Sequence, residues 1–253
     1  MAIGPLVGGV IGDIFGFRES FWVTGGLLAL SGLSIILWVQ EDFNPDGKIK
    51  RQSFFDTFRV LLRTPNMCGL YTVTFLETAG RMLFFPIASL FIMKLMGSSA
   101  GAATVTGIMM GIKAITGSAS AVLLGRIGDR VGHLKILLFS IIASVCFYFL
   151  QAFVNSAWQL ILLQALSGLA IGGMIPSLNA LMNCHAPSGS QGATYGLNAS
   201  ITAAGRSIAP MLGATIAMWF GMRSVFVVAA AIYGLAVLVV LFISRTEYIK
   251  TAS

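Results

Sequence analysis

Seven long apolar stretches limit what this chain can fold into. They lie at roughly residues 21–40, 67–93, 103–124, 136–154, 158–183, 192–219 and 224–244. An α-helix rises about 1.5 Å per residue, so about 20 residues cross the hydrocarbon core of a bilayer. Backbone N–H and C=O groups find no water there, and a helix bonds them internally. The stretches therefore predict an all-α protein that crosses a membrane repeatedly.

The composition agrees with a membrane protein and argues against other classes. Hydrophobic residues make up 57% of the chain and charged residues 10%, and the mean hydropathy is +0.88, well above that of a soluble domain. The net charge of +7 does not indicate a nucleic-acid partner, because most Lys and Arg residues lie in short connections between apolar stretches. The histidines and cysteines show neither metal-ligand spacing nor a nucleophile with a base. We therefore expect the lipid bilayer as a partner, and no nucleic acid, metal, cofactor or enzymatic activity.

The basic residues predict how the chain is oriented. Ten of them fall on one side of the expected spans: Lys48, Lys50, Arg51, Arg59, Arg63, Arg126, Arg130, Lys135, Arg245 and Lys250. Three fall on the opposite side: Arg18, Lys94 and Arg223. Cytoplasmic connections of membrane proteins carry the excess of Lys and Arg, so the first side is predicted to be cytoplasmic. The C-terminus at residues 245–253 then forms a cytoplasmic tail.

A connector at residues 41–66 separates two groups of expected spans. Phe54, Phe58, Leu61 and Leu62 share one helical face within it, which is typical of a short helix at the membrane interface. Residues 67–244 are then predicted to form a six-helix transmembrane bundle. Residues 1–40 are predicted to be the end of a preceding half.

One sequence unit occurs near both ends of the chain. The spacing of Pro5, Gly8, Gly16, Arg18 and Phe21 recurs, 205 residues further on, as Pro210, Gly213, Gly221, Arg223 and Phe226. The apolar residues 1–12 would reach only about 18 Å as a helix, which is too short to span a bilayer. We interpret them as the end of a helix that begins in a missing N-terminal half.

Four charged residues fall inside the expected spans: Glu77, Arg81, Lys113 and Arg206. A charge at the centre of a bilayer costs at least about 2.5 to 3.5 kcal/mol, so such residues face the protein interior or a hydrated cavity. Glu77 and Arg81 are four residues apart and meet on one helix face. They form either a fixed ion pair, or a pair that opens so that Glu77 binds and releases a proton.

Uncharged polar residues on the same or other helices extend this set of candidates. Asn198 shares a face with Arg206, and Gln164 and Asn179 lie on roughly one side of another helix. Such stripes line cavities between helices, but polar residues also hold lipid-embedded helices together. Both interpretations stay open for each residue.

Two motifs carry a resemblance to a known family. The segment Gly125-Arg-Ile-Gly-Asp129-Arg130-Val-Gly132, expected as a tight cytoplasmic turn, resembles the loop signature of the major facilitator superfamily. In that family the loop clamps the cytoplasmic face, with its Asp at a helix N-terminus of the other half, where the helix dipole favours a carboxylate. The family's antiporter-type helix motif is similar to two further sets of residues: Gly4, Pro5, Gly8 and Gly9, and then Gly205, Pro210 and Gly213.

The resemblance implies a major facilitator fold. The order of helices and motifs looks like helices six to twelve of a twelve-helix drug:proton antiporter, preceded by the end of helix five, and bacterial multidrug efflux proteins are the nearest group. It implies a carrier in the bacterial inner membrane that expels small amphipathic molecules by alternating access, coupled to protons. Three cationic side chains against one acid in the spans keep two alternatives open: a carrier of an anionic metabolite, and a remnant that does not transport.

Overall fold

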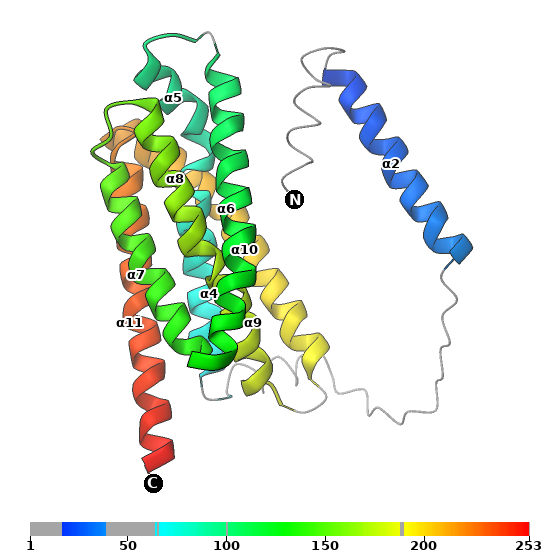
Figure 1. Cartoon of the computed structure of the whole chain (residues 1–253), viewed down its shortest axis with the longest axis vertical. Helices are drawn as coiled ribbons and strands as arrows, with labels where there is room; N and C mark the ends of the chain where they lie inside the picture. Colours follow the sequence, from blue (N-terminus) through cyan, green and yellow to red (C-terminus); the bar gives the residue numbers. More distant parts are fainter. Residues whose placement is uncertain (1–16, 39–63, 65, 100, 188–189, 253) are drawn as a thin grey trace. The chain divides into compact units, whose positions relative to one another are not determined.

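The computed structural model describes residues 17–38, 64, 66–99, 101–187 and 190–252, and within these residues the regular structure is helical (Figure 1). The chain divides into two compact units, Met1–Gln52 and Ser53–Ser253. The boundary between them falls inside the predicted connector. The interfacial helix expected there, and the short stretch at residues 1–12, lie outside the described residues.

Within the described residues of the first unit lies the helix α2, at Phe17–Trp38. From Phe21 to Trp38 its side chains are exposed and strongly apolar all round, and the helix is long enough to span a bilayer. A helix that is apolar on every side is stable in lipid or against other helices, not in water. This agrees with the span predicted at 21–40.

The second unit is a bundle of helices. Its elements are α4 (Met67–Met82), the 3₁₀ turn η1 (Phe85–Ile87), α5 (Ala88–Met96), α6 (Ala102–Val131), α7 (His133–Gln151), α8 (Ala157–Gly172), α9 (Met174–His185), α10 (Gln191–Phe220) and α11 (Ser224–Ala252). Six described segments have the length and composition of membrane spans: Phe21–Trp38, Met67–Met96, Ala102–Val131, His133–Gln151, Ala157–His185 and Ser224–Ser244. Six of the seven predicted spans thus correspond to helices that are long and apolar enough to cross a membrane. The chain is a multi-pass membrane protein.

The seventh predicted span corresponds to α10, which differs in composition. With 30 residues it is long enough to cross a bilayer, but it is less apolar than the six segments named above and is not among them. Its polar residues include Asn198, Thr202 and Arg206, which are spaced four apart and therefore lie on one face. A helix that lines a polar cavity has no need to be apolar on that face.

Two of the spans are interrupted, where the sequence predicted continuous helices. Between α4 and α5 the chain makes the turn η1, which contains Pro86. Proline has no N–H to donate and clashes with the preceding turn, so the regular helix stops there. Between α8 and α9 the break lies at Gly173, directly after Gly172 at the end of α8, and glycine has weak helix propensity.

Close helix contacts depend on glycine in the second unit. The helices α6 and α8 run against each other over much of their length. A Cβ on Gly168 of α8 would lie 2.6 Å from the backbone O of Lys113, and one on Gly172 would overlap the backbone of Gly117. Small residues let membrane helices approach in this way, and the hydroxyl of Ser120 donates across the contact to the backbone O of Leu169.

The interior of the bundle is built on one face of α11. A fully buried stripe recurs every three or four residues along this helix: Val225, Ala229, Tyr233, Ala236, Val240 and Ile243. It packs against α4 and α7, and α7 and α11 lie side by side in Figure 1. At one end of the stripe, Phe226 meets the rings of Phe84 and Phe91 at centroid distances of 4.7 and 5.3 Å. Apolar side chains on the outer faces of the bundle suit contact with lipid.

Candidate functional site

Three helices of the second unit enclose a polar pocket of about 150 Å³. Each helix contributes residues spaced three or four apart, so each presents one face to the pocket. The lining residues are Thr74, Glu77, Thr78 and Arg81 on α4, Ile175, Leu178 and Asn179 on α9, and Asn198, Thr202 and Arg206 on α10. Five of the seven residues predicted for proton coupling or substrate binding therefore line one pocket.

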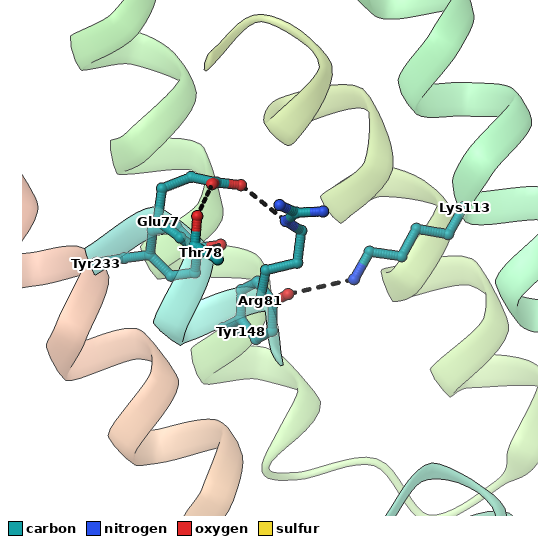
Figure 2. Close-up of polar contacts among 6 residues, drawn as sticks. All are labelled: Glu77, Thr78, Arg81, Lys113, Tyr148 and Tyr233. Atoms are coloured by element: carbon teal, nitrogen blue, oxygen red, sulfur yellow. Dashed lines mark hydrogen bonds and ion pairs between the residues drawn. The ribbon is translucent and has the colours of Figure 1, made fainter. Parts of the chain in front are cut away.

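The Glu77 carboxylate is the acidic group of this pocket. It is nearly buried, and Arg81 donates from Nε to its Oε1 at 2.8 Å. The neighbouring Thr78 hydroxyl donates to Oε2 at 3.1 Å, so both carboxylate oxygens accept a hydrogen bond (Figure 2). The predicted contact between Glu77 and Arg81 is present. Breaking a buried pair of this kind by removing one partner costs about 3 to 5 kcal/mol.

The opposite wall of the pocket, on α9 and α10, carries Asn179, Asn198 and Arg206. The Oδ1 atom of Asn198 is buried and has no hydrogen-bond partner among the described residues. The Arg206 side chain is exposed, and within the described part of the chain it has no salt bridge to a carboxylate. This wall therefore holds an unfilled acceptor and an uncompensated cation.

Lys113 lies outside the lining of the pocket. Its Nζ donates to the hydroxyl of Tyr148 on α7 at 3.2 Å and lies 5.5 Å from the centre of that ring. Tyr148 stacks on Tyr233 of α11, whose hydroxyl donates to the backbone O of Glu77 at 3.3 Å. Lys113 is therefore connected to the pocket through two aromatic rings (Figure 2).

Gln164 also lies outside the pocket. It is buried between α7 and α8, where its Nε2 donates to Oε1 of Gln151 at 3.2 Å, and Gln151 donates in turn to the Ser167 hydroxyl at 2.8 Å. The sequence placed Gln164 and Asn179 on roughly one side of a helix. Gln164 lies on α8 and Asn179 on α9, and of the two only Asn179 lines the pocket.

Sequence reasoning missed three residues that hold this site together. Thr78, Tyr148 and Tyr233 are buried, and each makes one of the hydrogen bonds described above. A buried tyrosine hydroxyl needs a partner, so a tyrosine in the middle of an apolar span is a signal that points to a polar neighbour.

The loop signature is mostly helical, which corrects the prediction of a tight turn over Gly125–Gly132. Gly125, Asp129 and Arg130 lie in the last turns of α6, and the break before α7 is confined to Gly132 at φ 102°. The Asp129 Oδ1 lies 3.1 Å from Nε2 of His133, and its side chain is 72% exposed. Basic residues marked the end of the apolar segment, and the helix simply continues past that end.

The antiporter-type motif on α10 packs this helix against α4 and the turn that follows it. A Cβ on Gly205 would lie 3.1 Å from Cγ2 of Thr78, and one on Gly213 would overlap the backbone of Leu83. Pro210 lies inside α10 between these two glycines. The first copy of the motif, with Gly4, Pro5, Gly8 and Gly9, lies outside the described residues.

A bundle of membrane-spanning helices around a charged pocket defines an integral membrane protein with an internal polar site. Its residues 70–252 match the family model of the Major Facilitator Superfamily, and the chain belongs to this family. The family is one of transporters, which agrees with the expectation that the chain is not an enzyme.

Several curated bacterial proteins are similar in sequence. Over 230 residues the chain is 31% identical to the multidrug resistance protein MdtG of Enterobacter lignolyticus, 32% to that of Serratia proteamaculans and 29% to that of Salmonella arizonae. Each alignment covers 91% of this chain but only 55%, 56% and 57% of the three relatives, in that order. The chain therefore spans about half the length of these relatives.

Proposed function

We propose that this chain is the C-terminal portion of a proton-coupled carrier that exports small amphipathic molecules by alternating access. Three observations support the proposal: membership of the Major Facilitator Superfamily, similarity to proteins named for multidrug resistance, and a polar pocket among spanning helices. In this family the two halves of a carrier enclose a cavity near the midplane of the membrane. The pocket between α4, α9 and α10 is this chain's share of that cavity.

Glu77 carries the proposal. It is a carboxylate inside a membrane-spanning segment, it lines the pocket, and its oxygens are held by Arg81 and Thr78. Buried carboxylates in spanning helices are costly and mark proton or substrate pathways. When a proton binds Glu77, the attraction to Arg81 is lost, and the guanidinium is free to meet a substrate. Glu77 is thus the proton-responsive group and Arg81 its modulator.

The rest of the lining suits an amphipathic substrate. Ile175 and Leu178 offer apolar surface, while Asn179, Asn198 and Arg206 offer donors and acceptors. A volume of about 150 Å³ is smaller than the roughly 300 to 1,000 Å³ of pockets that hold drug-sized ligands. We infer that these residues contact one side of the substrate and that the N-terminal half of the carrier supplies the other wall.

Uptake into proteoliposomes tests the role of Glu77. The full-length protein is reconstituted, and flux of a fluorescent amphipathic probe is measured with and without an imposed pH gradient. We expect saturable flux that depends on the gradient, and we expect Glu77→Gln to abolish the dependence on the gradient. Thr106→Val is a control, because the Thr106 hydroxyl donates to the backbone O of Ala102 within α6 and Thr106 is not among the residues that line the pocket.

Two outcomes would contradict the proposal. If Glu77→Gln keeps wild-type flux and wild-type dependence on the gradient, the carboxylate is a structural ion-pair partner. If the wild-type protein itself gives no saturable flux, the chain belongs to a form that does not transport.

We also propose that the protein lies in the bacterial inner membrane with its C-terminus in the cytoplasm. Arg126, Arg130 and Lys135 flank the turn at Gly132, and such basic residues favour the cytoplasmic side. A fluorescent protein fused to the C-terminus is expected to fluoresce, whereas an alkaline phosphatase fusion is expected to be inactive. The opposite pair of results would reverse the orientation.

Asp129 is the proposed gating residue at this cytoplasmic end. Its side chain points largely to the outside of the bundle, where it is available to a helix N-terminus of the other half. Gly125, Arg130 and Gly132 shape the same junction. We expect Asp129→Asn to lower export while leaving substrate binding in place, as measured by flux and by equilibrium binding of the probe.

A second candidate substrate class follows from the charge of the pocket. Glu77 offsets Arg81, and Arg206 then leaves one net positive charge, which favours an anionic group on the cargo. Competition between anionic and cationic probes of similar size separates the two classes. If the cargo is anionic, anionic probes compete better than cationic probes. Arg206→Gln is then expected to lower the affinity for anionic probes more than the affinity for cationic probes.

A further inference from the structure

The break between α8 and α9 changes how two backbone carbonyls are bonded. In a continuous helix the N–H of Gly173 would donate to the O of Leu169, but here it donates to the O of Ile171. The carbonyl of Gly172 also lacks its helical donor, because Pro176 has no N–H. A carbonyl in a spanning segment needs a donor from within the protein, so the O of Leu169 requires one from another element.

Ser120 of α6 supplies this donor. Its hydroxyl donates to the O of Leu169, in the last turn of α8, and the residue is only 3% exposed. Serine and threonine inside a helix often bond a carbonyl of their own helix, as Thr106 does with the O of Ala102. Ser120 instead bonds across to the neighbouring helix, at the turn where that helix ends.

Ser140 of α7 also lies beside the junction of α8 and α9. A Cβ on Gly173 would lie 2.6 Å from the Ser140 Oγ, so this hydroxyl is close to the backbone of the junction. It is buried and has no hydrogen-bond partner among the described residues. Of these two serines, Ser120 is therefore the one that bonds the junction.

The direction of α9 at this junction decides where Asn179 lies. Asn179 follows Gly173 by six residues, which corresponds to about 9 Å along a helix. A change of direction of about 10° at Gly173 would therefore move the Cα of Asn179 by roughly 1.6 Å. A donor and an acceptor about 3 Å apart lose their hydrogen bond when they separate by roughly 1 Å more. Since Asn179 lines the pocket, its contacts there depend on the junction.

We propose that Ser120 is a positioning residue that keeps Asn179 in place at the pocket by bonding the junction of α8 and α9. Without the Ser120 hydroxyl, the O of Leu169 regains the N–H of Gly173, and α9 changes its direction. The inference rests on the proposed function where it concerns cargo, because Asn179 affects export only if the pocket binds cargo. The direction of α9 can be measured without cargo.

Two native cysteines report the direction of α9. Cys184 lies near the end of α9, Cys146 lies on α7, and both are exposed, so both accept spin labels once the other cysteines of the full-length protein are replaced by Ser. Cys184 follows Gly173 by eleven residues, so we expect Ser120→Ala to shift the distance distribution by on the order of 3 Å. Ser118→Ala, at an exposed position of α6, is the matched control and is expected to keep the wild-type distances. Unchanged distances in Ser120→Ala overturn the inference and leave the proposed function standing.

Equilibrium binding of the fluorescent probe separates a positioning role from a general structural one. We expect Ser120→Ala to lower the affinity of the full-length protein about five-fold, the size of one lost hydrogen bond. In an Asn179→Ala background the same change is expected to have no further effect. An equal loss in both backgrounds, or no loss in either, overturns the inference. If the wild-type protein binds no probe, the proposed function falls and the role of Asn179 in binding falls with it, while the distance between Cys146 and Cys184 still decides whether Ser120 places α9.

Discussion

The ring of Tyr233 fills the space where a side chain on Gly80 would lie. A Cβ on Gly80 would be 2.8 Å from Cε2 of Tyr233 and 3.2 Å from Cδ2. The ring is fully buried, stacks on Tyr148 and is bonded through its hydroxyl to the backbone O of Glu77. Gly80 directly precedes Arg81, so this contact fixes the turn of α4 that carries the ion pair.

Gly80→Ala is expected to destabilise the bundle, because the Tyr233 ring has no free direction in which to move. Forcing an extra methyl into a packed core costs about 1 to 3 kcal/mol. A chain of this size loses roughly 2 to 4 °C of melting temperature per kcal/mol, which a thermal melt in detergent detects. Gly111→Ala on α6 is the matched control, since a Cβ there meets open space. Equal melting temperatures for the two variants would contradict this explanation.

Two substitutions of Tyr233 separate the contribution of its ring from that of its hydroxyl. Tyr233→Phe keeps the stacking and removes a bond of 3.3 Å to a backbone oxygen, so we expect a loss of about 1 kcal/mol or less. Tyr233→Ala leaves a cavity, and removal of a buried aromatic ring costs about 3 to 5 kcal/mol. Melting temperatures measured in the same detergent should fall in that order. A loss for Phe as large as the loss for Ala would show that the hydroxyl, and not the ring, makes the main contribution.

The fold was predictable from the sequence where local properties decide it. The spans follow from hydropathy over about 20 residues, and the contact between Glu77 and Arg81 follows from their spacing on one helix. The end of α6 was placed too early because Arg126 and Arg130 end the apolar segment, whereas the helix ends only where Gly132 adopts a positive φ.

The candidate site was predictable only in part, because contacts between distant helices decide it. Asn179, Asn198 and Arg206 were identified as polar residues in spans, but their meeting with Glu77 depends on how α4, α9 and α10 pack. Lys113 was identified by its charge, yet its partner Tyr148 lies 35 residues away on another helix. No periodicity within one helix contains that information.

Gly132→Ala is expected to strain the junction between α6 and α7. The backbone at Gly132 has φ 102° and ψ 130°, a region that a residue with a Cβ avoids. Strain of this type costs of order 1 to 3 kcal/mol. We expect a lower melting temperature, with Gly107→Ala on α6 as the control where a Cβ meets open space. If the two variants melt alike, the junction relaxes without cost.

The glutamine pair between α7 and α8 provides a test of how buried amides stabilise membrane helices. Gln164→Leu leaves Oε1 of Gln151 without its donor, and Gln151→Leu leaves the Gln164 amide without its acceptor. Each single variant is expected to lose about 1 kcal/mol, because a buried polar group without a partner is costly. The double variant removes both groups and should lose less than the sum, with an interaction energy near the roughly 0.6 kcal/mol average for bonds between membrane helices. A double-mutant cycle built from unfolding free energies measures this term. Strict additivity would mean that the bond between the two amides does not stabilise the contact between α7 and α8.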